Sequence, residues 1–116
     1  MAYTDRRSYV ISSVISDTAG GIANATALNA TNFAGMAVKT PAGATAQTLS
    51  VYWAETKAGT YVPAIGQDGD ALTFNNGSNV AASNGYEASH GIWVFPWIKI
   101  VAGSSQQTGL VAVLVT

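Results

Sequence analysis

The residues that could support catalysis are few and scattered along the chain. His90 is the only histidine, and it directly follows Ser89. A serine nucleophile and a histidine base need a defined spatial arrangement and a third group that orients the base, and adjacency in the sequence supplies neither. We therefore expect no catalytic triad. A single histidine also excludes a metal site built from several histidines of one chain.

Two pairs of acidic residues could bind a metal ion or hydrolyse a glycosidic bond. Asp68 and Asp70 flank Gly69, and calcium prefers carboxylate oxygens of this kind. The other acidic positions of a calcium loop are missing, and Asp-Gly is typical of a tight turn, so we interpret this segment as a β-turn. Glu55 and Glu87 could be the two carboxylates of a glycosidase, but nothing in the sequence brings them to the required separation. We predict a protein that is not an enzyme and that uses no metal and no cofactor.

A row of aromatic residues is a stronger sign of binding than any polar group. Trp93, Phe95 and Trp97 alternate with non-aromatic residues, so an extended backbone would place the three rings on one face. Such a row can pack in a core, anchor a protein partner or stack against sugars. Pro96 disfavours a regular central strand here because it cannot donate a hydrogen bond to a sheet. The sequence leaves the three interpretations open.

The composition of the chain points to contact with other chains. Only 9% of the 116 residues are charged, against about 25% in typical soluble domains. So little charge indicates a surface partly covered by partners, although a neutral secreted-type β domain would share this composition. The net charge of −1 gives no general attraction to nucleic acid or to an anionic membrane. No apolar run reaches the roughly 20 residues of a membrane span, so we expect neither nucleic acid nor membrane as a partner.

The elements that would position these residues are all predicted to be β-strands. The clearest are a pair at 47–54 and 60–63, in which Leu49, Val51 and Trp53 alternate with other residues and would face the core. Further strands are predicted at 9–15, 35–40, 71–74, 97–101 and 110–115, with an irregular strand at 22–32. Residues 80–89 are interpreted as a loop, with a strand at its start as the alternative. Turn signals recur at roughly 8–12 residues, and no amphipathic helix is evident. This predicts an all-β chain: a polar arm at 1–8, then a single antiparallel β-sandwich at 9–116, of jelly-roll or galactose-binding-like type.

The two ends of the chain hold further candidates for partner contacts. Arg6 and Arg7 lie in the arm, where they could attach to an acidic surface or belong to a frayed terminus. Val111, Val113 and Val115 alternate with other apolar residues, so the last predicted strand is apolar on both faces. A strand with one wet face should alternate apolar and polar residues. Either both faces are buried within the subunit, or a partner covers one of them, because an uncovered edge of this kind promotes aggregation.

A series of motifs runs through the second half of the chain. It reads Val-Tyr-Trp-Ala-Glu-Thr, Lys-Ala-Gly-Thr, Tyr-Val-Pro-Ala, Asp-Gly-Asp and Trp-Ile-Lys-Ile-Val-Ala-Gly. Over residues 49–116 this order resembles small β-sandwich structural proteins of tailed phages, including head decoration (cement) and head-fibre proteins. The resemblance implies a non-enzymatic virion protein that decorates or stabilises the capsid through oligomeric contacts. The implied partners are the major capsid protein or another virion protein, and further copies of the chain, with a trimer as the first guess.

These observations give one leading hypothesis and two alternatives. No signal peptide is visible, so we expect a protein made in the host cytoplasm and assembled there into the virion. The expected partner contacts are Arg6, Arg7, Trp93, Phe95, Trp97, Val111, Val113 and Val115. The alternatives are a carbohydrate-binding module, with Trp93 and Trp97 as the sugar platform, and a tail-fibre or baseplate subunit.

Overall fold

The fold of this chain is built from β-strands. The computed structural model describes residues 8–17, 22–30, 35–87, 95–104 and 107–115; in the first and last of these ranges it describes the backbone, together with the side chain of Ile15. The strands are β1 (Ser8–Asp17), β2 (Leu28–Asn29), β3 (Gly35–Lys39), β4 (Leu49–Ala54), β5 (Val62–Pro63), β6 (Gly85–Glu87), β7 (Trp97–Ala102) and β8 (Gln107–Val115). The helices in the described part are two short 3-10 turns, η1 (Ile22–Asn24) and η2 (Asn75–Gly77), and neither is long and apolar enough to cross a membrane. The predicted all-β class is confirmed.

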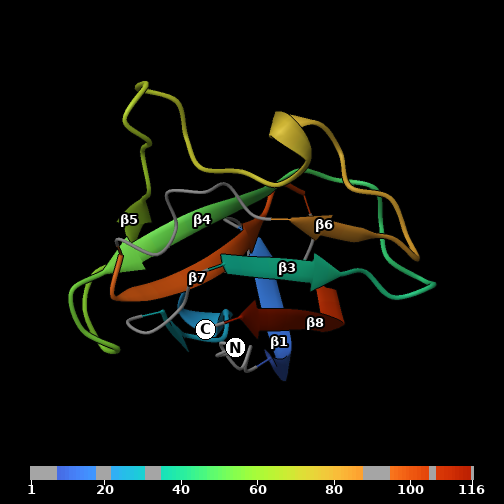
Figure 1. Cartoon of the computed structure of the whole chain (residues 1–116), viewed down its shortest axis with the longest axis horizontal. Helices are drawn as coiled ribbons and strands as arrows, with labels where there is room; N and C mark the ends of the chain where they lie inside the picture. Colours follow the sequence, from blue (N-terminus) through green and yellow to red (C-terminus); the bar gives the residue numbers. More distant parts are fainter. Residues whose placement is uncertain (1–7, 18–21, 31–34, 88–94, 105–106, 116) are drawn as a thin grey trace, which may run out of the picture.

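The strands follow one continuous path that folds into two halves (Figure 1). The order is β5-β4-β7-β1-β8-β3-β6, and β2 pairs with β7 beside this path. The neighbours are antiparallel except β1 and β7, which pair in parallel at Ser16 and Asp17. We call β5, β4, β7 and β2 the first half-sheet, and β8, β3 and β6 the second. β1 belongs to both, because most of its length pairs with β8 and its end pairs with β7.

An irregularity in the pairing explains how β1 reaches both halves. Ser13 pairs with Leu110, but Ile15 pairs with Gln107, so β8 contributes one residue more than β1 in this stretch. An extra residue in one strand bends the pair and increases its twist. The bend lies just before Ser16, where β1 meets β7. β1 therefore connects the two half-sheets at this point.

The core lies between the inner faces of the two half-sheets. Alternation along the strands places Leu49 and Val51 of β4 in one buried cluster with Met36 and Val38 of β3. The rest of this cluster is Ile15, Leu28, Ala30, Ala64, Leu72, Phe74, Val80, Ile98, Ile100 and Ala102. Trp53, which we expected to face the core, is partly buried and packs against the cluster. The predicted core face of the 47–54 strand is thus the observed one.

Three of the predicted elements differ from the structure. The irregular strand expected at 22–32 is the turn η1 followed by the two-residue strand β2. The strand expected at 71–74 forms only isolated bridges, because the backbone of Leu72 divides its hydrogen bonds between two segments: its N–H donates to Ala64 and its carbonyl accepts from Val51. The loop expected at 80–89 contains β6, which extends the edge of β3.

Candidate functional site

The outer face of the first half-sheet holds a buried lysine. In β7, Ile98 and Ile100 face the core, so Lys99 lies on the opposite face, in register with Tyr52 of β4. Only 8% of the Lys99 surface is exposed. Lysine is rarely buried to this extent unless its charge is paired. Lys99 is therefore the most unusual charged residue in the described part of the chain.

Two segments of the chain cover Lys99 from outside. Its Nζ donates hydrogen bonds to the backbone carbonyls of Ile22 (3.1 Å) and Ala23 (3.4 Å) in η1. The same Nζ lies 4.5 Å from the centre of the Tyr61 ring, just before β5, in a cation–π contact. The Tyr61 hydroxyl donates to the carbonyl of Lys57 at 2.9 Å, which ties the ring to the turn after β4. Lys99 thus links η1 to the segment between β4 and β5.

Burial changes the acid–base behaviour of this cluster. The pKa of Lys99 is lowered because burial disfavours its charged form. The pKa of Tyr61 is raised for the same reason, because its charged form is the phenolate. Tyr61 therefore stays neutral at physiological pH, and the positive charge of Lys99 is held at an energetic cost.

A pocket opens above Lys99 between the two covering segments. It has a volume of about 360 Å³ and is lined by Ile22 and Ala23, by residues 57–59, and by Tyr61 and Lys99. Lys57 is a second lysine in this lining, and its side chain is exposed. Two of the three lysines of the chain line this one pocket. With amines and a neutral phenol as its polar side chains, it is suited to an anionic group.

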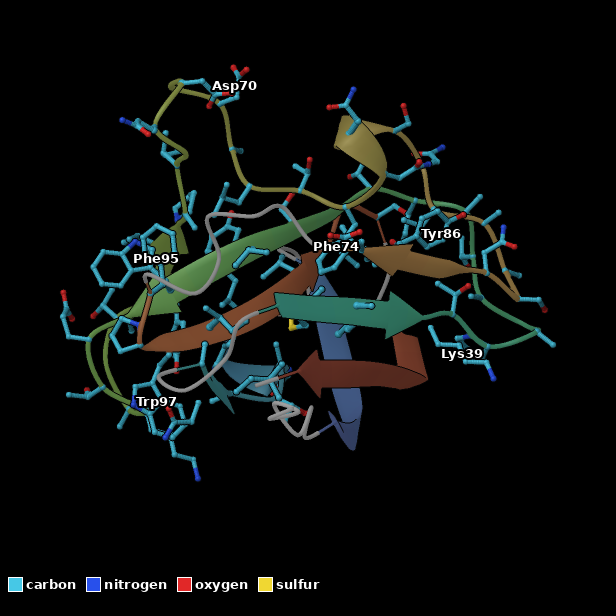
Figure 2. All side chains as sticks on the ribbon, in the orientation of Figure 1. Lys39, Asp70, Phe74, Tyr86, Phe95 and Trp97 are labelled. Carbon is cyan, nitrogen blue, oxygen red and sulfur yellow. The ribbon has the colours of Figure 1, made fainter. Side chains whose placement is uncertain are left out.

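The predicted aromatic row does not run through Phe95 and Trp97. Phe95 precedes β7 and packs against the core and against Trp53, with ring centres 5.0 Å apart and planes inclined by 38°. Trp97 begins β7 on the outer face, in register with Ala54. Figure 2 shows the two side chains well apart. The backbone bends at Pro96, so alternation does not continue through it. Trp93 lies outside the described residues.

The last strand is a central strand. β8 pairs with β1 on one side and with β3 on the other, so its backbone is not an open edge. Val111 pairs with Lys39 and Val113 with Ala37, while Val115 pairs with Gly35. We call the face that contains these positions the outer β8 face.

The register places the outer β8 face away from the core. Met36 and Val38 of β3 are buried in the core, whereas Ala37 is half-buried and Lys39 is exposed. Residues paired directly across strands share one face of a sheet, so the three valine positions lie opposite the core face. Glu87 of β6, which pairs with Ala37, is also exposed. Arg6 and Arg7 lie outside the described residues.

The acidic residues form a turn rather than a ligand set. The Oδ1 of Asp68 accepts a hydrogen bond from the backbone N–H of Asp70 at 3.1 Å, and Gly69 between them has a φ of +89°. Glu55 follows β4 and Glu87 ends β6, so they belong to different half-sheets. The described residues contain no group of three or more His, Cys, Asp or Glu that could hold a metal ion. His90 lies outside them.

Sequence reasoning missed the pocket. In the sequence, Lys99 belongs only to the predicted strand at 97–101, and Tyr61 only to the predicted strand at 60–63. The available signal was a lysine on the second face of a strand whose other members, Trp97 and Val101, are apolar.

The fold is also found in a protein of prophage origin. The chain is similar to the crystal structure of the SPBc2 prophage-derived protein YomS, with a TM-score of 0.52 and 14% sequence identity. The similarity covers 100% of this chain and 99% of that one. No protein-family model matches the sequence, and no curated protein matches it. At this identity the comparison shows a common fold.

Proposed function

We propose that this protein is a non-enzymatic structural component of a phage virion that decorates or stabilises the capsid as an oligomer. The observation that carries the proposal is the fold, which is similar over the whole chain to that of a prophage-derived protein. The low charge content, 9% of residues, fits a subunit whose surface is partly covered in an assembly. A subunit that binds only the assembled shell stabilises that shell by mass action, and repeated contacts on a lattice add avidity.

The outer β8 face is the surface proposed for contact between copies. Val111, Val113 and Val115 form a continuous apolar row by register, beside the half-buried Ala37. A second copy of the chain could cover this row with the same row of its own, since apolar surface removed from water stabilises association. In this proposal the inner face of β8 belongs to the core of the subunit, and its outer face contacts a second copy of the chain.

The proposal is tested by asking whether the protein belongs to virions. Purified, salt-washed virions of the phage that encodes the chain should contain the protein in many copies, measured by quantitative mass spectrometry against the major capsid protein. Sedimentation of the isolated protein should show a concentration-dependent oligomer. A protein that is absent from virions and remains monomeric at high concentration would contradict the proposal.

The location within the virion separates the head role from the tail-fibre or baseplate alternative. Heads and tails separated after disruption should carry the protein on the heads. Its recovery with tails would replace the decoration role with the tail role. The carbohydrate-binding alternative, with Trp93 and Trp97 as the sugar platform, stays a prediction, since Trp93 lies outside the described residues. Binding on a glycan array would favour it over the virion role.

A further inference from the structure

The Lys99 ammonium has partners but no counter-charge. It has three N–H donors, and the two acceptors that it contacts are neutral backbone carbonyls in η1, one of them at the long distance of 3.4 Å. Its third contact is the face of the Tyr61 ring. Among the residues that the structure describes, no carboxylate pairs with this ammonium. Only 8% of the Lys99 residue is exposed, and a lysine covered to this extent normally has its charge paired, so the site favours an anion from outside the described chain.

The lining of the pocket narrows the kind of anion. The remaining polar groups are largely engaged: the Tyr61 hydroxyl donates to Lys57, and the Gly59 N–H donates to the Thr56 carbonyl at 3.1 Å. The cationic side chains of the lining are Lys57 and Lys99, and the longer Lys99 hydrogen bond, 3.4 Å to the Ala23 carbonyl, is the one that an incoming anion would replace. Ile22 and Ala58 add apolar surface. Two lysine side chains suit the two oxygens of a carboxylate, because charge-assisted hydrogen bonds to ionised oxygens are the stronger ones.

We propose that this pocket binds a carboxylate on a short aliphatic chain. Lys99 holds the carboxylate from the floor and Lys57 from the mouth, while Ile22 and Ala58 contact the aliphatic part. The carboxylate belongs either to a small organic acid or to the side chain of an Asp or Glu of another protein. This site is separate from the outer β8 face and does not depend on the virion role.

The direct test observes the lysine in the wild-type protein. Side-chain NMR of isotopically labelled lysine gives the pKa of each ammonium, and glutarate and a blocked Gly-Glu-Gly peptide serve as the two probes. Either probe should raise the pKa of Lys99, because a nearby negative charge favours the ammonium. Equal affinities of the two probes would indicate a small acid as the natural ligand. Tighter binding of the peptide would indicate a protein side chain.

Substitutions of single lysines test whether the two probes bind in this pocket. Lys57→Met should weaken binding about two- to fivefold, as expected for an exposed ion pair. Lys99→Met should weaken it by about tenfold or more, as expected for a buried charge pair. Lys39→Met is the matched control, because Lys39 is exposed on β3 in the second half-sheet and should leave the affinity unchanged. If Lys99→Met fails to fold, the pKa of Lys99 in the wild type and the probe affinity of Lys57→Met still test the proposal.

Two results would overturn the proposal. One is a Lys99 pKa that does not move with either probe at tens of millimolar. The other is an affinity that Lys39→Met lowers as much as Lys57→Met does, because this would mark a general charge effect of the surface.

Discussion

The two half-sheets share one core but differ in how their outer faces are covered. The outer face of β7 carries Lys99 and Val101, and both are buried, Lys99 under η1 and the segment that contains Tyr61. The outer β8 face has the half-buried Ala37 and the exposed Lys39 beside its valine positions. The outer face of the first half-sheet is thus covered by segments of the same chain, and one of the residues buried there, Lys99, is a lysine.

The difference suggests that the two half-sheets bind different kinds of partner. The covered face holds a small pocket lined by Lys57 and Lys99, which suits a compact ligand. The outer β8 face has an apolar row by register, which suits another sheet. The low charge of the chain therefore has a different explanation in each half-sheet. The outer face of the first is covered by segments of the same chain, and we propose that a second copy covers the outer face of the second.

The largest effect is expected from a charge on the outer β8 face. Val113→Asp should raise the dissociation constant of the oligomer by about 100-fold or more, because a carboxylate at the centre of an apolar interface loses its hydration. Multi-angle light scattering after size exclusion measures the mass. Val62→Asp is the control, since Val62 is 45% exposed on β5 and should not change the mass. If Val113→Asp leaves the mass of the oligomer unchanged, the outer β8 face is not the contact between copies.

The same substitution on the two faces sharpens the comparison. Val101 is 3% exposed under its own chain, so Val101→Asn should lower the free energy of unfolding by about 2–4 kcal/mol, from lost apolar burial and an amide without good partners. Val113→Asn should change it by less than about 1 kcal/mol in dilute monomer. Urea unfolding at low protein concentration measures both. Equal losses would mean that both positions are buried within the subunit.

Lys99 should make the stability of the covered face depend on pH. Burial lowers the pKa of Lys99 in the folded protein, so the unfolded chain binds more protons between this lowered value and the usual lysine pKa of about 10.4. In that window stability rises with pH. The wild type should therefore gain stability relative to Lys99→Met as the pH is raised towards 10. Tyr61, whose raised pKa removes stability above about 10, is present in both proteins. A difference that is constant with pH would contradict the burial of the charge.

The smallest effect is expected from the hydroxyl of Tyr61. Tyr61→Phe keeps the ring over Lys99 but removes the hydrogen bond to the Lys57 carbonyl, and should cost about 0.5–1 kcal/mol. Amide hydrogen exchange in residues 57–61 should become faster while exchange in β3 stays unchanged. Slower or unchanged exchange in residues 57–61 would show that the Tyr61 hydroxyl does not hold this segment in place over Lys99.

The sequence predicted the strands that are defined by their own alternation. Leu49 and Val51 alternate along β4, and the predicted strand lies where the structure has it. β6 was missed because three residues carry no period, and their extended state depends on pairing with β3. The segment 71–74 was predicted as a strand because it is locally strand-like, but its hydrogen bonds go to two different segments.

The candidate site was predictable only in part. The valines of the last strand could be named from their apolar neighbours, but the face on which they lie needed the register with β3. The pocket could not be predicted, because Lys99 donates to carbonyls that are 77 and 76 residues away in the sequence. The burial of one lysine is decided by contacts that local patterns do not contain.

The absence of cysteine in the chain allows a direct test of the outer β8 face. Val113→Cys and the control Val62→Cys would each be reacted with a thiol reagent, first in dilute monomer and then in the assembled oligomer or virion. We predict that Cys at position 113 reacts in the monomer and is protected in the assembly, whereas Cys at position 62 reacts in both. Protection of position 113 already in the monomer, or equal reactivity in both states, would contradict the proposal that this face joins the subunits.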